Sequence, residues 1–380
     1  MRFPAISRLF LPVLLAALVC LIGARTMQAG ADGNVPPGPS TLVEFPLPQP
    51  RADLAAIYRS REDGAGAPVD AATVFSPDDR WQVTDTQKLP FRAIAQLVIF
   101  DEYDEIDSTC SGVLLSARVV LTAAHCIYSG GSYAGSVLVV PGRDGSDWPY
   151  GAGLGVKMAV PVGWAEGRGA SNDSSGPPSP YDWGLIVIGV ADWQDQIAPY
   201  PVVATASDAY FQKGGFVVGT AGYPGDKPLG TQWAATSPEY FVDTTYLYTR
   251  VDIFPGQSGS PVFALGPESA FIFSVVSVGN DKLNLSVRFT PAVATALRNY
   301  ASDLGASLTT YVVPESPGPT ASPTPTKTPS PTPAKSQSPT PAATLTPKAS
   351  PSPSPTASAT PKPTQQPAGF RLTLGQISRD

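Results

Sequence analysis

The sequence predicts an all-β fold, either a sandwich or closed barrels, and three observations support it. Short β-branched and apolar runs recur between residues 74 and 313, separated by Gly, Pro, Asp and Ser turns. These runs do not alternate with helices, as the strands of an α/β sheet would. Only residues 292–304 repeat apolar side chains at helical spacing, after Thr290 as a cap and Pro291 in the first turn. The expected strands are 93–100, 112–115, 119–123, 137–140, 185–188, 216–219, 246–251, 261–264, 271–278 and 286–289.

Composition narrows the class of protein. With 42% hydrophobic and 15% charged residues, the 380-residue chain has the balance of a globular protein. One histidine and three cysteines are too few for zinc fingers, haem attachment or a disulfide-dense miniprotein. Residues 32–313 carry 16 Lys and Arg against 29 Asp and Glu, so this part of the chain is acidic. An acidic body argues against a nucleic-acid partner.

The N-terminus has the pattern of a secretory signal peptide over residues 1–31. Arg2 and Arg8 come first, an apolar run covers residues 9–23, and small residues precede Asp32. The apolar run is shorter than the roughly 20 residues that span a bilayer. We therefore expect a secreted protein without a stable membrane span. Cleavage would leave only Cys110 and Cys126, which an oxidising compartment would pair.

Composition also divides the rest of the chain. Residues 32–73 are polar and broken by proline, so we expect a propeptide or linker with no core of its own. Residues 74–313 form the folded domain. Residues 314–367 contain 17 prolines in 54 positions and predict a disordered Pro/Ser/Thr-rich stalk, through which the protein could associate with a cell surface. Residues 368–380 are a short C-terminal segment to which we assign no role.

Three segments carry residues suited to nucleophilic catalysis. The sole histidine, His125, directly follows an expected strand, and Asp182 lies at the start of another. Ser258 lies in a Gly-Gln-Ser-Gly turn, where the backbone amides of Gly256 and Ser258 could converge as an oxyanion hole. An aspartate behind an imidazole fixes its tautomer, and the imidazole takes a proton from the serine. These segments predict a His-Asp-Ser triad.

The order of the three residues separates the serine-hydrolase folds. An α/β-hydrolase needs its histidine after the nucleophile and Gly-x-Ser-x-Gly around it, whereas residue 260 is serine. A subtilisin-like order would need an aspartate before His125, held by a parallel α/β sheet that the pattern does not predict. The order found is that of the chymotrypsin fold.

At these residues the chain resembles the chymotrypsin-like serine endopeptidases, closest to the staphylococcal-type glutamyl endopeptidases. Thr-Ala-Ala-His-Cys at 122–126 resembles the histidine loop of the broad family, and residues 79–86, 222–228 and 256–262 resemble the narrower group. The resemblance covers about residues 74–305. It implies two six-stranded antiparallel β-barrels, roughly 74–195 and 196–313, a C-terminal helix, and an active site in the cleft between the barrels. It also implies a Cys110–Cys126 disulfide, a polypeptide substrate, no cofactor and no metal, and a monomer.

Substrate specificity is where the resemblance ends. Glutamyl endopeptidases recognise glutamate with a histidine after the nucleophile and a threonine five residues before it; here those positions resemble Ser277 and Ile253. Asp252 lies where trypsin-like enzymes keep the carboxylate that binds Arg or Lys. Two interpretations stay open: Asp252 selects a basic side chain, or it is a hydrogen-bond acceptor at a strand end.

Processing and activity leave two further expectations. The resemblance places the mature N-terminus near Val74. The alternative is that the protein is a catalytically inactive homologue that serves as a surface or extracellular binding module. In that case a fluorophosphonate probe would not label Ser258.

Overall fold

The computed structural model describes residues 26–27, 40–60, 73–167, 179–191, 193, 196–214, 217–265, 270–280 and 282–314. Apart from strand β1 (Thr26–Met27), the expected signal peptide lies outside the described residues, as do the stalk after residue 314 and the segment 368–380. No helix among the described residues is long and apolar enough to cross a membrane.

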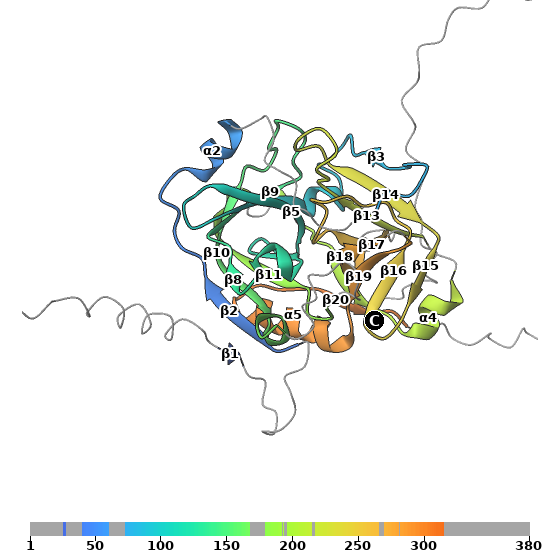
Figure 1. Cartoon of the computed structure of the whole chain (residues 1–380). Helices are drawn as coiled ribbons and strands as arrows, with labels where there is room; N and C mark the ends of the chain where they lie inside the picture. Colours follow the sequence, from blue (N-terminus) through green and yellow to red (C-terminus); the bar gives the residue numbers. More distant parts are fainter. Residues whose placement is uncertain are drawn as a thin grey trace, which may run out of the picture. The chain divides into compact units, whose positions relative to one another are not determined.

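Strands from the first half of the chain form one sheet (Figure 1). They are β1, β2 (Leu42–Pro46), β4 (Ile94–Phe100), β5 (Ile106–Leu114), β6 (Val119–Thr122), β9 (Ser136–Pro141), β10 (Gly153–Pro161) and β11 (Gly184–Ala191). Their hydrogen-bonded order is β1-β2-β10-β11-β6-β5-β4-β9, and β10 also pairs with β9. This extra pairing closes β4, β5, β6, β11, β10 and β9 into a ring, so the first half is a barrel filled by apolar side chains.

A second sheet follows, which we call the second barrel; in Figure 1 it is drawn mostly in yellow and orange, with one short edge strand in blue. Its strands are β3 (Trp81–Gln82), β12 (Val202–Thr205), β13 (Val218–Gly222), β14 (Trp233–Ser237), β15 (Tyr240–Val242), β16 (Tyr246–Thr249), β17 (Pro261–Leu265), β18 (Ala270–Gly279), β19 (Asn284–Arg288) and β20 (Thr310–Val312). The main path β15-β16-β19-β18-β17-β13-β14-β3 is antiparallel, but β12 pairs in parallel with β18 and β20. The all-β prediction is confirmed, and each expected run overlaps an observed strand.

The described residues also form four helices, α2 (Leu54–Ser60), α3 (Val162–Ala165), α4 (Asp208–Lys213) and α5 (Pro291–Asp303), and the 3-10 turns η1 (Phe91–Ala93) and η2 (Ala124–Cys126). Strands β7 (Tyr128–Ser129) and β8 (Ser132–Tyr133) form a small hairpin. The C-terminal helix begins as the sequence predicts, because the Thr290 hydroxyl accepts a hydrogen bond from the backbone amide of Val293. Its apolar face, which includes Leu297 and Tyr300, is buried.

Residues 42–60, part of the segment 32–73 that the sequence predicts to be a propeptide or linker, pack against the first barrel. Strand β2 pairs with the edge of β10, and helix α2 buries Leu54 and Tyr58 against β4 and β9. Periodicity alone missed this helix, because it presents only two buried side chains one turn apart. The barrel supplies the rest of the apolar surface, from Val98, Phe100 and Leu138.

Candidate active site

Strand pairing in the first barrel brings His125 and Asp182 together. Strands β6 and β11 are antiparallel neighbours, with Thr122 opposite Gly184, so the turn that follows β6 lies beside the segment that precedes β11. The Nδ1 atom of His125 lies 2.8 Å from the Oδ2 atom of Asp182. The backbone amide of His125 donates to the other carboxylate oxygen at 3.0 Å. One contact from the ring and one from the backbone therefore hold His125 against a buried carboxylate.

The second barrel contributes a third contact to this carboxylate. Ser277, on β18, donates its hydroxyl to the Oδ2 atom of Asp182 at 2.5 Å. Burial by itself raises the pKa of Asp182, but the charge of His125 and the hydrogen bonds from His125 and Ser277 outweigh it and lower the pKa. Asp182 therefore stays ionised. The sequence placed Ser277 among the specificity residues; the structure gives its hydroxyl a partner in Asp182 instead.

Ser258 lies in the turn before β17, packed against the first barrel. Its carbonyl accepts a hydrogen bond from the Ser111 amide at 2.9 Å, and the Cys126 sulfur lies 3.7 Å from the same oxygen. Because Cys126 follows His125 directly, these contacts place the serine turn beside the histidine. Gly259 has a φ of 81°, and a Cβ there would lie 2.1 Å from the Thr122 hydroxyl, so only glycine fits.

Ser111 links the two barrels, a role that the sequence analysis missed. The fully buried hydroxyl of Ser111 donates to the Gly256 carbonyl at 2.8 Å and accepts from the Tyr223 amide at 2.9 Å. The only signal available was its place beside Cys110, on a strand expected near the histidine. One side chain of β5 thus holds two backbone segments of the second barrel.

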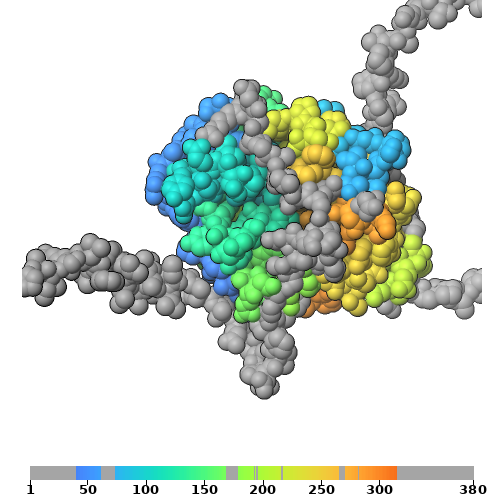
Figure 2. Space-filling view, viewed as in Figure 1, coloured from blue at the N-terminus to red at the C-terminus, as the bar shows by residue number. Residues whose placement is uncertain are grey.

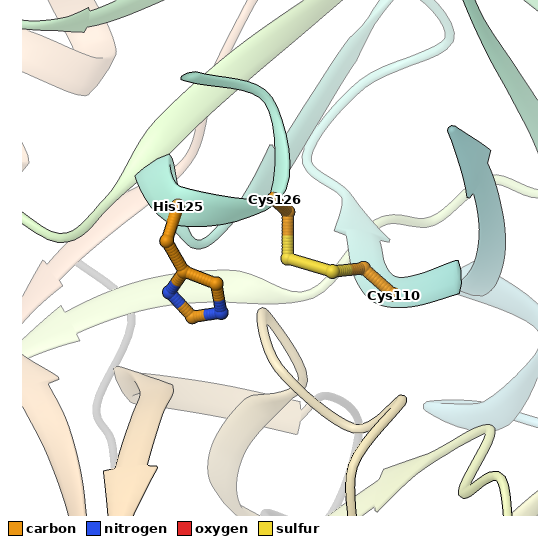
Figure 3. A group of neighbouring side chains, drawn as sticks. All are labelled: Cys110, His125 and Cys126. Carbon is orange, nitrogen blue, oxygen red and sulfur yellow. A yellow bond between two sulfur atoms is a disulfide. The ribbon is translucent and has the colours of Figure 1, made fainter. Parts of the chain in front are cut away.

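A disulfide anchors the turn that carries His125. Cys110 on β5 is bonded to Cys126 on η2, as the sequence led us to expect. Figure 3 shows the side chains of His125 and Cys126 extending from the same short turn, with the imidazole beside the sulfur bridge. The ligand atoms of Cys110, His125 and Cys126 lie within 4.8 Å of one another, the spacing of a metal site. Both sulfurs are committed to the disulfide, however, and cannot act as thiolate ligands.

The structure places Asp252 and Ile253 against the segment that begins at Thr73. The Asp252 carboxylate accepts hydrogen bonds from the amides of Phe75 at 2.7 Å and Asp79 at 3.2 Å. The Ile253 amide donates to the Thr73 carbonyl at 3.2 Å. Burial raises the pKa of Asp252, and the two amide hydrogen bonds oppose that rise. Of the two open interpretations for Asp252, these contacts match the hydrogen-bond acceptor.

Known proteins with similar sequences belong to the class that the observed fold indicates. The sequence profile described as Trypsin matches residues 82–302. A glutamyl endopeptidase of Bacillus licheniformis is 32% identical over 78% of this chain and 97% of that protein. A Bacillus subtilis protein called extracellular metalloprotease is 29% identical over 75% of this chain and 95% of its own length.

Among solved structures, that of a Glu endopeptidase in complex with MPD matches with a TM-score of 0.50 and 24% identity. It covers 61% of this chain and 100% of that one. This likeness shows the fold, and the profile and the first relative show the family. The comparisons give no support to the catalytically inactive alternative. The chain therefore belongs to the trypsin family and is a serine endopeptidase of chymotrypsin-like fold.

Proposed function

We propose that this endopeptidase cleaves peptide bonds through Ser258, His125 and Asp182. The observation that carries the proposal is the 2.8 Å contact between His125 Nδ1 and Asp182 Oδ2, which fixes the orientation of the ring that is to take the proton of the serine. Ser258 attacks the substrate carbonyl while His125 takes its proton and later donates it to the leaving amine. Asp182 stabilises the imidazolium, and water then hydrolyses the acyl-enzyme.

The tetrahedral intermediate needs two converging donors, for which we propose the amides of Gly256 and Ser258. Gly256 has a φ of 98°, a conformation that L side chains rarely adopt. The Ser111 hydroxyl fixes the carbonyl of the same residue. Each such donor contributes about 3 to 4 kcal/mol of transition-state stabilisation in comparable sites.

Replacing the nucleophile tests the assignment. Ser258→Ala should lower kcat by about a millionfold and abolish labelling by a fluorophosphonate probe. Ser260→Ala is a matched control, because it removes a buried hydroxyl two residues away that makes no hydrogen bond among the described residues. The control should keep both hydrolysis and labelling. Full activity in Ser258→Ala would end the assignment of the nucleophile.

The side chain preferred before the scissile bond is a separate proposal. Relatives named glutamyl endopeptidase support cleavage after glutamate, and the two amide hydrogen bonds to Asp252 argue against a basic pocket. We therefore propose an acidic preference that does not involve Asp252. A peptide library should show cuts after Glu; efficient cuts after Arg or Lys would instead support the Asp252 pocket.

Secretion and processing complete the proposal. The N-terminal pattern supports export, and the name of the Bacillus subtilis relative includes the word extracellular. We propose that residues 1–31 are removed, that residues 32–73 act as a propeptide, and that the monomeric domain 74–313 precedes a stalk that could hold it at a surface. N-terminal sequencing of protein from the culture medium should find a start near Val74.

We propose no metal for this site, although the same relative is called a metalloprotease. The His125, Cys110 and Cys126 group is the only trio of His, Cys, Asp and Glu side chains with metal-like spacing among the described residues. The sulfurs of Cys110 and Cys126 form a disulfide, and the Nδ1 atom of His125 contacts Asp182. These three side chains therefore do not fit a metal ion. Activity should therefore survive removal of metals by a chelator.

A further inference from the structure

A buried arginine joins the segment before β3 to a loop of the second barrel. The side chain of Arg80 is only 1% exposed and makes two bidentate ion pairs. Its Nε and Nη2 atoms lie 3.0 and 2.9 Å from the carboxylate of Asp78. Its Nη1 and Nη2 atoms lie 2.9 and 2.5 Å from that of Asp226. A buried guanidinium tolerates loss of such a partner poorly, because an unpaired charge remains.

Asp226 belongs to the loop 222–228, which packs directly against Pro255 and Gly256. The Gly225 amide donates to the Pro255 carbonyl at 2.8 Å. A Cβ added to Gly256 would lie 2.5 Å from the carbonyl oxygen of Tyr223 and 3.2 Å from the Gly225 nitrogen. The loop therefore leaves no space between itself and the backbone just before the proposed nucleophile.

This packing determines which way the Gly256 amide faces. In a trans peptide the C=O and N–H groups point in opposite directions. Because the Pro255 carbonyl is bonded to the loop, the Gly256 amide points away from the loop. Rotating that peptide by half a turn would break the bond to Gly225 and replace the amide by a carbonyl oxygen, which repels an oxyanion.

The residues that form these ion pairs come from distant points of the sequence. The light-blue segment that follows Thr73 lies beside yellow and orange residues of the second barrel (Figure 2). Arg80 is 146 positions before Asp226 in the chain, and Lys227 of the same loop also reaches Asp78, at 2.9 Å. The ion pairs thus tie the loop to the segment that leads into β3.

We propose that Arg80 is a positioning residue for the oxyanion hole. Through Asp226 it holds the loop 222–228 against the Pro255–Gly256 peptide, so that the Gly256 amide faces the substrate carbonyl. The inference rests on the proposed catalytic function and adds to it the source of the amide's orientation. Arg80 itself does not touch substrate.

Two variants test the proposal by separating transition-state from ground-state binding. Asp226→Asn keeps the shape of the side chain and removes its charge, and Arg80→Lys keeps the charge and removes the bidentate geometry. Each variant should lower kcat about tenfold and change KM less than twofold. The expected loss in kcat is smaller than the hundredfold or larger loss caused by removing an oxyanion donor outright, because the Gly256 amide is displaced and not removed. Affinity for a peptide aldehyde, which forms an oxyanion with the serine, should fall by the same factor. Affinity for the matching product peptide acid should not change.

The matched control is Asp208→Asn, which removes the carboxylate that lies 2.5 Å from another buried arginine, Arg288. It should leave kcat and aldehyde affinity unchanged. Folded Asp226→Asn or Arg80→Lys protein with kcat within twofold of the parent would overturn the proposal, as would equal losses of aldehyde and product affinity. If one variant fails to fold, the other decides. Failure of the catalytic proposal can be told apart from failure of the Arg80 proposal. If the catalytic proposal fails, the parent enzyme itself shows no labelling at Ser258.

Discussion

Replacing Ser111 by alanine should destabilise the domain far more than its small size suggests. The buried hydroxyl accepts from the Tyr223 amide and donates to the Gly256 carbonyl. Both partners lie in the second barrel, and alanine would leave two backbone groups without these hydrogen bonds. Each unsatisfied buried group costs about 1 to 3 kcal/mol. We therefore expect the free energy of unfolding to fall by about 4 kcal/mol.

Urea unfolding followed by tryptophan fluorescence measures this loss. The midpoint should move to lower urea with an unchanged slope, and the thermal midpoint should fall by roughly 8 to 16 °C for a domain of this size. Ser274→Ala is the matched control, because Ser274 is equally buried and its hydroxyl makes no hydrogen bond among the described residues. That control should be neutral or slightly stabilising. A loss below about 1 kcal/mol in Ser111→Ala, or an equal loss in the control, would refute the reasoning.

Three other contacts lead to further predictions. Removing the disulfide by Cys110→Ala with Cys126→Ala opens a loop of 16 residues, which should cost about 3 kcal/mol in urea unfolding; a shift below about 1 kcal/mol would contradict the estimate. Ser277→Ala removes a charge-assisted hydrogen bond to Asp182, so kcat should fall about tenfold while KM stays constant, and an unchanged kcat would argue against this role. Asp78 has a pKa lowered by hydrogen bonds from the buried guanidinium beside it, so its stabilising effect is complete above the unfolded-state pKa of about 3.9 and is lost as pH falls. Thermal midpoints of the parent and Asp78→Asn should therefore differ at pH 6, and the difference should begin to narrow only as pH falls below about 4, whereas a constant gap would contradict the assignment.

Local sequence carried most of the information about the candidate site. His125, Asp182 and Ser258 each lie beside a short apolar strand, and their order along the chain distinguished the chymotrypsin fold from other hydrolases. The capped helix α5 was equally readable, because its cap, proline and apolar face are neighbours in sequence. Such features depend on residues a few positions apart, and so they appear in the sequence itself.

Strand β10 and the segment with β2 and α2 were not predicted. Strand β10 has no continuous β-branched run, and it is a strand because β9, β11 and β2 provide its hydrogen-bond partners. Helix α2 depends on apolar surface supplied by β4 and β9. Neither the strand nor the helix is stabilised by its own residues alone; each depends on partners from elsewhere in the chain.

The amino-acid sequence by itself determined the class of fold and the family resemblance, and it indicated the residues to which we assign the chemistry. Only the tertiary structure decided what each of them touches. Asp252 contacts the amide of Phe75, 177 positions earlier, and Ser277 contacts Asp182, 95 positions earlier. A hydrogen bond forms only between groups that lie close in space, whereas a sequence pattern records only how far apart residues are along the chain. Residues far apart in the sequence come within hydrogen-bonding distance only when the two barrels fold and pack together.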